Sequence, residues 1–165
     1  MSRMLPDPWS PYGYHIIQGL TDGIMSAPAT GSWSSANRAI YVPMIFPCDT
    51  TVYAIYTRSN SATGNYDLGL YGPDMNRLVS AGTTANASAP LTLSVPSIRV
   101  FGGYTYWIGL AYSSTSSFYR SIVDSDSQML AMEGAMQDSA LPLPSTMTPV
   151  FNTTTQVPLV GVGVR

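Results

Sequence analysis

The sequence predicts an all-β protein: an antiparallel β-sandwich of jelly-roll-like form with an extended N-terminal arm. Only 10% of the 165 residues are charged, and strong helix formers are scarce because the chain has no Lys and Glu133 is its single Glu. Tyr, Gly and Pro are abundant instead, with 11, 14 and 13 copies, a mixture typical of pleated strands joined by tight turns. Short apolar runs separated by turn residues recur along most of the chain, whose length suits one domain.

Residues 1–36 are expected to form an extended arm used in docking or assembly. They contain Pro6, Pro8, Pro11 and Pro28 and show no sustained period of 2 or 3.6 residues. Their apolar side chains are too numerous for a solvated tail, so we expect the arm to lie across the domain or a neighbouring subunit.

Residues 37–165 are expected to form the sandwich. Apolar runs bounded by Gly, Pro, Asn, Asp and Ser predict seven strands, at 40–46, 51–58, 65–71, 77–81, 91–95, 104–112 and 157–164. Strands of this number and spacing form two antiparallel sheets most economically. A parallel α/β fold is disfavoured because no long amphipathic helix lies between the strands.

Three local features refine this prediction. The alternating side chains of residues 104–112 are partly apolar on both faces, as expected of a central strand. Pro43 lies inside the first strand and predicts an edge or a bulge, because its nitrogen cannot donate to the ladder. Residues 127–136 are the only predicted helical turn, which Gly134 keeps short.

The stretch Asn65 to Gly82, NYDLGLYGPDMNRLVSAG, brings Asp67, Asp74 and Asn76 close together and raises the question of a metal site. A hairpin explains it better, because Gly, Pro, Asp and Asn all have structural roles in a reversal at residues 72–76. Calcium would require several more convergent oxygens than this loop supplies. We therefore predict a turn and no metal or other cofactor.

No catalytic site is predicted. His15 is the only His, so any Ser-His-Asp arrangement would have to use a residue of the arm. There is no Lys for a Schiff base, no G-x-S-x-G motif and no Gly-rich phosphate loop. The chain is expected not to be an enzyme, with a hydrolase as the weakest alternative. The single Cys48 excludes an intrachain disulfide and is expected to be buried.

The charge pattern argues against nucleic acid and membrane partners. The net charge is −2 and the seven basic residues, all Arg, are dispersed, so no stripe exists to follow a phosphate backbone. No apolar run is long enough to span a membrane, and Pro6, Asp7 and Pro8 interrupt the position of a signal-peptide core. We expect synthesis in a cytoplasm without secretion by that route.

Aromatic residues supply the positive signal for function. Three Trp, 11 Tyr and four Phe exceed what a sandwich of this size needs inside, so some should face outward. Exposed Tyr and Trp anchor protein interfaces or stack on sugar rings. The residues expected to form a docking surface are Met4, Leu5, Trp9, Tyr12, Tyr14 and Trp33. Trp107 is the candidate for a glycan contact, with ordinary core packing as the alternative.

Several segments resemble a β-sandwich domain found in structural proteins of tailed bacteriophages, including capsid decoration (cement) proteins. They are ANRAIYVPMIFPCDTTVYAIYTRSNSATGNYDLGLYGPDMNRLVSAG, GGYTYWIGLAYSS, ALPLPSTMTPVF and VPLVGVGV. The resemblance covers residues 37–165, leaves the arm outside, and includes no catalytic residues.

The resemblance implies a virion protein made in the host cytoplasm, most directly a decoration protein on the outer surface of the head. Its partners would be the major capsid protein lattice or other virion proteins, and we expect a homo-oligomer, a trimer or a dimer. Related sandwiches also occur in tail, neck and fibre components. The alternative function is therefore a carbohydrate-binding or receptor-binding module of such a component.

Overall fold

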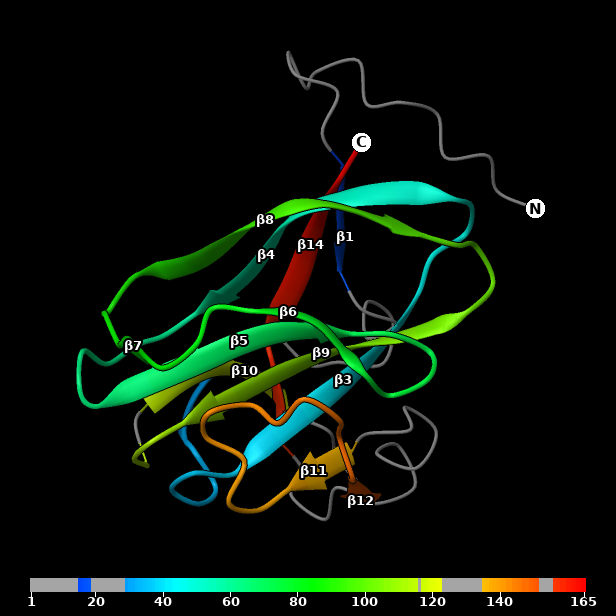
Figure 1. Ribbon diagram of the computed structural model, residues 1–165. Helices are drawn as coiled ribbons and strands as arrows, with labels where there is room; N and C mark the ends of the chain where they lie inside the picture. Colours follow the sequence, from blue (N-terminus) through cyan, green and yellow to red (C-terminus); the bar gives the residue numbers. More distant parts are fainter. Residues whose placement is uncertain (1–14, 19–28, 116, 123–134, 152–155) are drawn as a thin grey trace.

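The computed structural model describes residues 15–18, 29–115, 117–122, 135–151 and 156–165. Within these ranges the chain forms strands and no helix, and antiparallel sheets pack against each other (Figure 1). The predicted all-β sandwich is confirmed. Residues 1–14 of the predicted arm lie outside the described residues.

The larger sheet contains seven strands. They are β3 (Ala39–Ile45), β5 (Asn65–Tyr71), β6 (Arg77–Ser80), β7 (Thr84–Ala85), β9 (Thr105–Tyr112), β11 (Ala135–Gln137) and β12 (Val150–Phe151). The order is β12-β11-β3-β9-β5-β6, with β7 also pairing with β5. β9 is central, as predicted, and pairs with β3 through Pro43↔Trp107 and with β5 through Tyr71↔Trp107.

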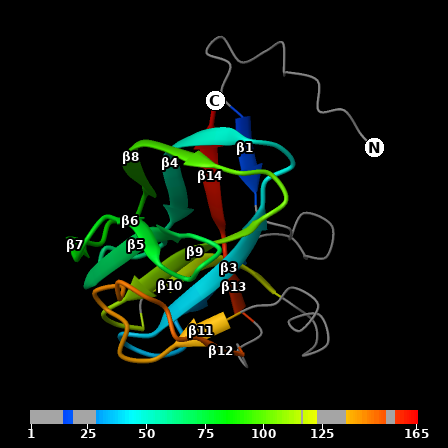
Figure 2. The same ribbon diagram turned by 45° about the vertical axis from the view of Figure 1, so that its right-hand side comes forward.

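The opposite layer contains a four-stranded and a three-stranded sheet. The first has the order β1-β14-β4-β8, and the second has the order β13-β10-β2. Their strands are β1 (His15–Gln18), β2 (Ala29–Ser32), β4 (Thr50–Arg58), β8 (Pro90–Val100), β10 (Ser117–Ile122), β13 (Gln156–Pro158) and β14 (Val160–Val164). The long strands β3, β4, β5, β8 and β9 alternate between the layers of the sandwich (Figure 2).

The main core lies between the two layers. The alternation of β9 determines which side chains enter it: Tyr106, Ile108, Leu110 and Tyr112 are buried in this core. Trp33 is buried among them with only 1% of its surface exposed. Its ring makes edge-to-face contacts with Tyr112 and Phe118 at centroid distances of 4.9 and 4.7 Å.

A second, smaller apolar cluster covers the outer face of the larger sheet. Residues 138–149, here called the strap, run between β11 and β12 and lie over β3, β9 and β5 (Figure 1). The strap contributes Ala140, Leu143 and Met147 to this cluster. They pack on Tyr41 and Tyr71 of the sheet, so the larger sheet is buried on both faces.

All seven predicted strands are present, with small changes of boundary. The predicted strand 157–164 is divided at Leu159 between β13 and β14, and the predicted strand 91–95 is longer. On one side of β3, Pro43 pairs with Trp107 of β9. The predicted edge or bulge at Pro43 stays a prediction, because the described pairs on the other side of β3 cover only Ala39 to Tyr41.

Two expectations are corrected. The prediction of a helical turn at 127–136 is wrong for its last two residues. Ala135 and Met136 belong to β11, where pairing with β3 overrides their preference for a helix. Residues 127–134 lie outside the described residues. Cys48 is exposed in the β3–β4 turn rather than buried. In addition, β1 pairs with β14 and β2 with β10, so parts of residues 1–36 join the sandwich.

Candidate functional site

The β5–β6 turn is the hairpin that the sequence predicts. The Gly72 N–H donates to the Asn76 carbonyl (2.8 Å), and the Met75 N–H donates to the Gly72 carbonyl (3.0 Å). Asp74 accepts bonds from the backbone and side-chain amides of Asn76, at 3.2 and 2.9 Å. These bonds keep the carboxyl ionised by lowering the pKa of Asp74. Its oxygens therefore serve the turn itself.

The β8–β9 turn lies beside it. The Phe101 N–H donates to the Tyr106 hydroxyl (2.9 Å), and the Gly103 N–H donates to the Phe46 carbonyl (2.9 Å). Gly102 is required at its position because an added Cβ would lie 2.6 Å from the Cα of Cys48. The close contact between these two backbones fixes the turn against the β3–β4 connection and leaves Tyr104 exposed.

The two turns, which lie on the right in Figure 1, contribute to the lining of an open groove. The groove has a volume of about 410 Å³. It is lined by residues 72–74 of the first turn and by Leu78, Ile98, Arg99, Phe101, Tyr104 and Tyr106. We call it the mouth groove. Three of its apolar side chains are unusually exposed, namely Leu78 (45%), Phe101 (48%) and Tyr104 (57%).

One cation lies at the rim of the mouth groove. Arg99 pairs with Asp49 at 3.2 Å, and its guanidinium lies 5.3 Å from the centroid of the Phe101 ring. The Gly102 N–H, and then Arg99, lower the pKa of Asp49, which is therefore ionised at neutral pH. An apolar, aromatic groove with this rim is suited to holding an apolar peptide segment or a sugar ring.

Asp67 is absent from the groove although it neighbours the hairpin in sequence. Its side chain is fully buried beneath the strap, and Oδ2 accepts bonds from the Leu143 N–H (2.9 Å) and the Ser80 hydroxyl (3.4 Å). Within the described residues, Oδ1 has no hydrogen-bond partner. Burial raises the pKa of Asp67, and the Leu143 N–H acts in the opposite direction but less strongly. This carboxyl holds the strap and is closed to ligands.

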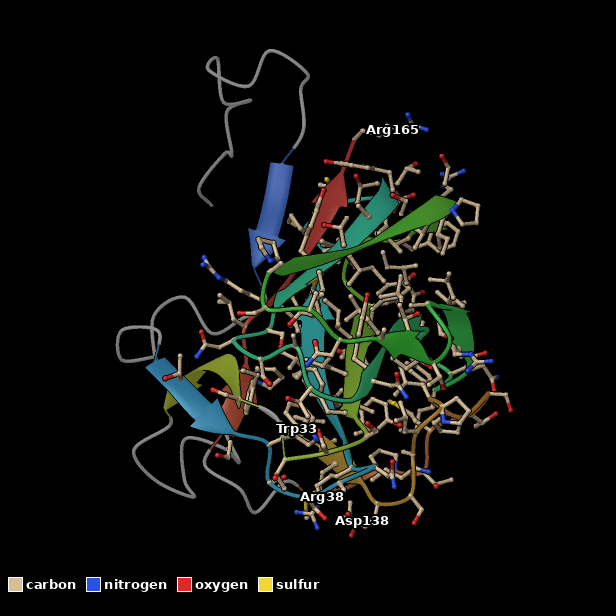
Figure 3. All side chains as sticks on the ribbon, turned by 90° about the vertical axis from the view of Figure 1, so that its left-hand side faces the viewer. Trp33, Arg38, Asp138 and Arg165 are labelled. Atoms are coloured by element: carbon tan, nitrogen blue, oxygen red, sulfur yellow. The ribbon has the colours of Figure 1, made fainter. Side chains whose placement is uncertain are left out.

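Further bonds attach the strap along its length. The Tyr71 hydroxyl donates to the Pro144 carbonyl (2.7 Å), and the Arg77 side chain donates to the Leu143 carbonyl. At the start of the strap, Arg38 forms a bidentate pair with Asp138, at 2.6 and 3.1 Å (Figure 3). This pairing lowers the pKa of Asp138.

The prediction that Trp33 belongs to the docking surface is corrected. It is buried in the core, and its indole N–H donates to the Arg38 carbonyl (2.8 Å), so its ring is not available to a partner (Figure 3). The other five predicted docking residues lie outside the described residues: Met4, Leu5, Trp9, Tyr12 and Tyr14. His15 lies on β1, where it pairs with Val164.

Trp107, the predicted glycan contact, is half-buried and packs against the cluster beneath the strap. It does not line the mouth groove. The groove residues Leu78, Phe101 and Tyr104 were missed by the sequence interpretation. The signal was present in the string VFGGYTY, where two Gly residues mark a turn flanked by aromatic side chains.

Neither a metal site nor a membrane span is found in the described part of the chain. No group of three or more His, Cys, Asp or Glu side chains converges there. None of the secondary structure in the described ranges is a helix with the length and hydrophobicity needed to cross a bilayer.

Comparisons with known proteins do not assign a family. No family model matches the chain, and no curated protein sequence matches it significantly.

Proposed function

We propose that this chain is a non-enzymatic structural protein of a tailed-bacteriophage virion, and that it binds the assembled head as a decoration protein. The observation that supports a binding role is the mouth groove, where apolar and aromatic side chains are exposed on a well-packed sandwich. Exposed aromatic residues at a groove are typical of protein interfaces. The resemblance of residues 37–165 to phage structural proteins supplies the virion context.

Binding of this kind would stabilise the head by mass action. A subunit that contacts neighbouring capsid proteins in the assembled lattice, and not the separated proteins, shifts the equilibrium toward assembly. We assign the docking contacts to the mouth groove together with residues 1–14 of the arm. A trimer or dimer that matches lattice symmetry would multiply these contacts. Neither nucleic acid nor membrane is proposed as a partner.

The test is cosedimentation with capsids that lack the protein. The full-length chain should bind saturably, whereas Tyr104→Ala and a chain lacking residues 1–14 should bind about tenfold more weakly. The deletion ends at residue 14 because β1, β2 and Trp33 belong to the fold. Val150→Ala is the matched control, since Val150 is 62% exposed on β12, outside the groove.

The outcomes separate the parts of the proposal. Normal binding by Tyr104→Ala would exclude the groove as a docking surface. No binding by any correctly folded form would exclude the decoration role.

A carbohydrate-binding or receptor-binding module in a tail, neck or fibre is the second candidate. Tyr104 supports it, because its exposed ring lies in a groove with Arg99 at the rim, whose guanidinium can bond sugar hydroxyls. Binding to a glycan array that is lost with Tyr104→Ala would favour this function. Loss of binding with Trp107→Phe instead would place the sugar at the predicted position near the strap.

A further inference from the structure

Within the described residues, one carboxylate at the mouth groove has no cation as a partner. The described ranges contain four Asp and no Glu. Asp49 and Asp138 each pair with an arginine, and Asp67 is fully buried. The remaining one, Asp74, is exposed, lines the groove and accepts bonds from the neutral amides of Asn76. Because it is ionised, it places an uncompensated negative charge at the groove.

The arginine that lines the groove does not compensate this charge. Arg99 pairs with Asp49, and its guanidinium lies against the Phe101 ring. The charges of Arg99 and Asp49 cancel, so the groove retains the charge of Asp74. This balance favours a cationic occupant, because a neutral partner would desolvate Asp74 without pairing it.

Tyr104 offers a second contact to such a cation. Its side chain is 57% exposed, and within the described residues its ring stacks on no other aromatic ring and on no arginine. A guanidinium over a Tyr face is attracted by the ring, and it can pair with a carboxylate at the same time. Tyr104 and Asp74 line the same groove of about 410 Å³, so one long basic side chain can contact both.

The rest of the lining requires apolar groups beside the cation. Leu78 and Phe101 are 45% and 48% exposed, and Ile98 continues the apolar surface. A small hydrophilic cation, such as a polyamine, would leave this surface in water. A peptide segment with apolar side chains next to a basic one would cover it.

We propose that the mouth groove binds a segment of a partner protein in which an arginine is flanked by apolar side chains. The arginine pairs with Asp74 over the ring of Tyr104, and the apolar side chains cover Leu78 and Phe101. The inference rests on the docking role proposed for the groove, and it adds the chemistry of the partner.

An NMR titration of the isotope-labelled full-length protein tests this chemistry without capsids. The probe is a blocked tripeptide with arginine between two leucines, and the matched peptide has the uncharged citrulline in place of arginine. The arginine peptide should shift the amide signals of Asp74, Leu78 and Tyr104. It should bind about fivefold to tenfold more tightly than the citrulline peptide, and the difference should decrease as salt is added.

Two variants assign the preference to one carboxylate. Asp74→Asn keeps an acceptor for the turn but loses the charge, so it should bind the two peptides equally. Asp138→Asn removes the same charge outside the groove and keeps an acceptor for Arg38, so it should retain the wild-type preference.

Three results would contradict the proposal. Equal affinity of the wild type for the two peptides would overturn it, as would the failure of both to shift these amide signals. Shifts of the same signals on concentrating the protein alone would assign the groove to a second copy of the chain and would overturn the proposed partner.

Capsid binding separates this inference from the docking role. Occupancy that falls in Tyr104→Ala but not in Asp74→Asn would refute the arginine of the partner and keep the groove as a docking surface. Preference for the arginine peptide without any binding to capsids would support the inferred chemistry and refute the head as the partner.

Discussion

Replacing Asp67 by Ala should destabilise the protein by releasing the centre of the strap. The main loss is the bond from the Leu143 N–H, at 2.9 Å, because the Ser80 contact at 3.4 Å is long. A bond to a charged group contributes about 1.5–3 kcal/mol, and a buried N–H left without an acceptor costs about 1–3 kcal/mol. Removal of a desolvated carboxylate offsets part of this. We expect a net loss of about 2 kcal/mol at neutral pH, or about 4–8 °C in Tm.

The variant Asp67→Asn separates the hydrogen bond from the charge. Its amide side chain would keep an oxygen for the Leu143 N–H but would not titrate. Because burial raises the pKa of Asp67 in the folded state, folding of the wild type takes up a proton. Its contribution to stability is fully present below the unfolded-state pKa of about 4 and is lost as pH rises through the folded-state pKa. The stability of the wild type relative to Asp67→Asn should therefore increase as pH falls from 7 to 4.

Urea unfolding followed by circular dichroism measures both effects, with Asp67→Ala, Asp67→Asn and the wild type compared at each pH. Asp49, Asp74 and Asp138 have lowered pKa values and give the opposite slope, but they are common to all three proteins and cancel in the difference. An Ala variant as stable as the wild type would refute the role of the Leu143 bond. A pH-independent difference between the wild type and Asp67→Asn would refute the raised pKa.

Two further substitutions probe the core and the groove. Trp33→Phe leaves the Arg38 carbonyl without its donor and opens space beside Phe118, so thermal or urea unfolding should show a loss of about 2–4 kcal/mol. Capsid occupancy at saturation should stay normal for the folded variant. A loss of occupancy would indicate that Trp33 belongs to the docking surface. Gly102→Ala forces the backbone of Cys48 to move and should lower stability by about 1–3 kcal/mol, with weaker binding because the β8–β9 turn shifts. Unchanged stability and occupancy would show that the turn accepts a side chain there.

The strands could be predicted because each carries local information. The two faces of β9 follow directly from alternation, since its even-numbered residues from Tyr106 to Tyr112 enter the main core and Ala111 and Trp107 pack beneath the strap. The β5–β6 turn was equally predictable, because bonds among nearby residues, from Gly72 to Asn76, satisfy its backbone.

The short strands and the strap could not be predicted, because long-range contacts determine them. β11 has three residues and exists through its pairing with β3, which lies far away in the chain. Asp67 looked like a turn or metal-binding residue because of its neighbours in sequence. The partner that explains it, the Leu143 N–H, is 76 residues distant. Trp33 was assigned to the arm for the same reason, since its contacts with Tyr112 and Phe118 have no local signal.

The strap also connects the buried Asp67 to the mouth groove. Beyond Leu143, the Arg77 N–H donates to the Ser145 carbonyl (2.8 Å), and the Met147 N–H donates to the Met75 carbonyl (3.0 Å). The Thr146 hydroxyl donates to Asn76 Oδ1 at 2.8 Å. These bonds attach the strap to residues 75–77 at the end of the β5–β6 turn, and residues 72–74 of the same turn line the groove.

A loosened strap should therefore weaken the groove without changing any of its residues. In Asp67→Ala, capsid occupancy should fall at temperatures well below the Tm of the variant. Asp67→Asn, which retains the Leu143 bond, should show wild-type occupancy. Wild-type occupancy of the Ala variant would show that the turn keeps its shape through its own bonds alone.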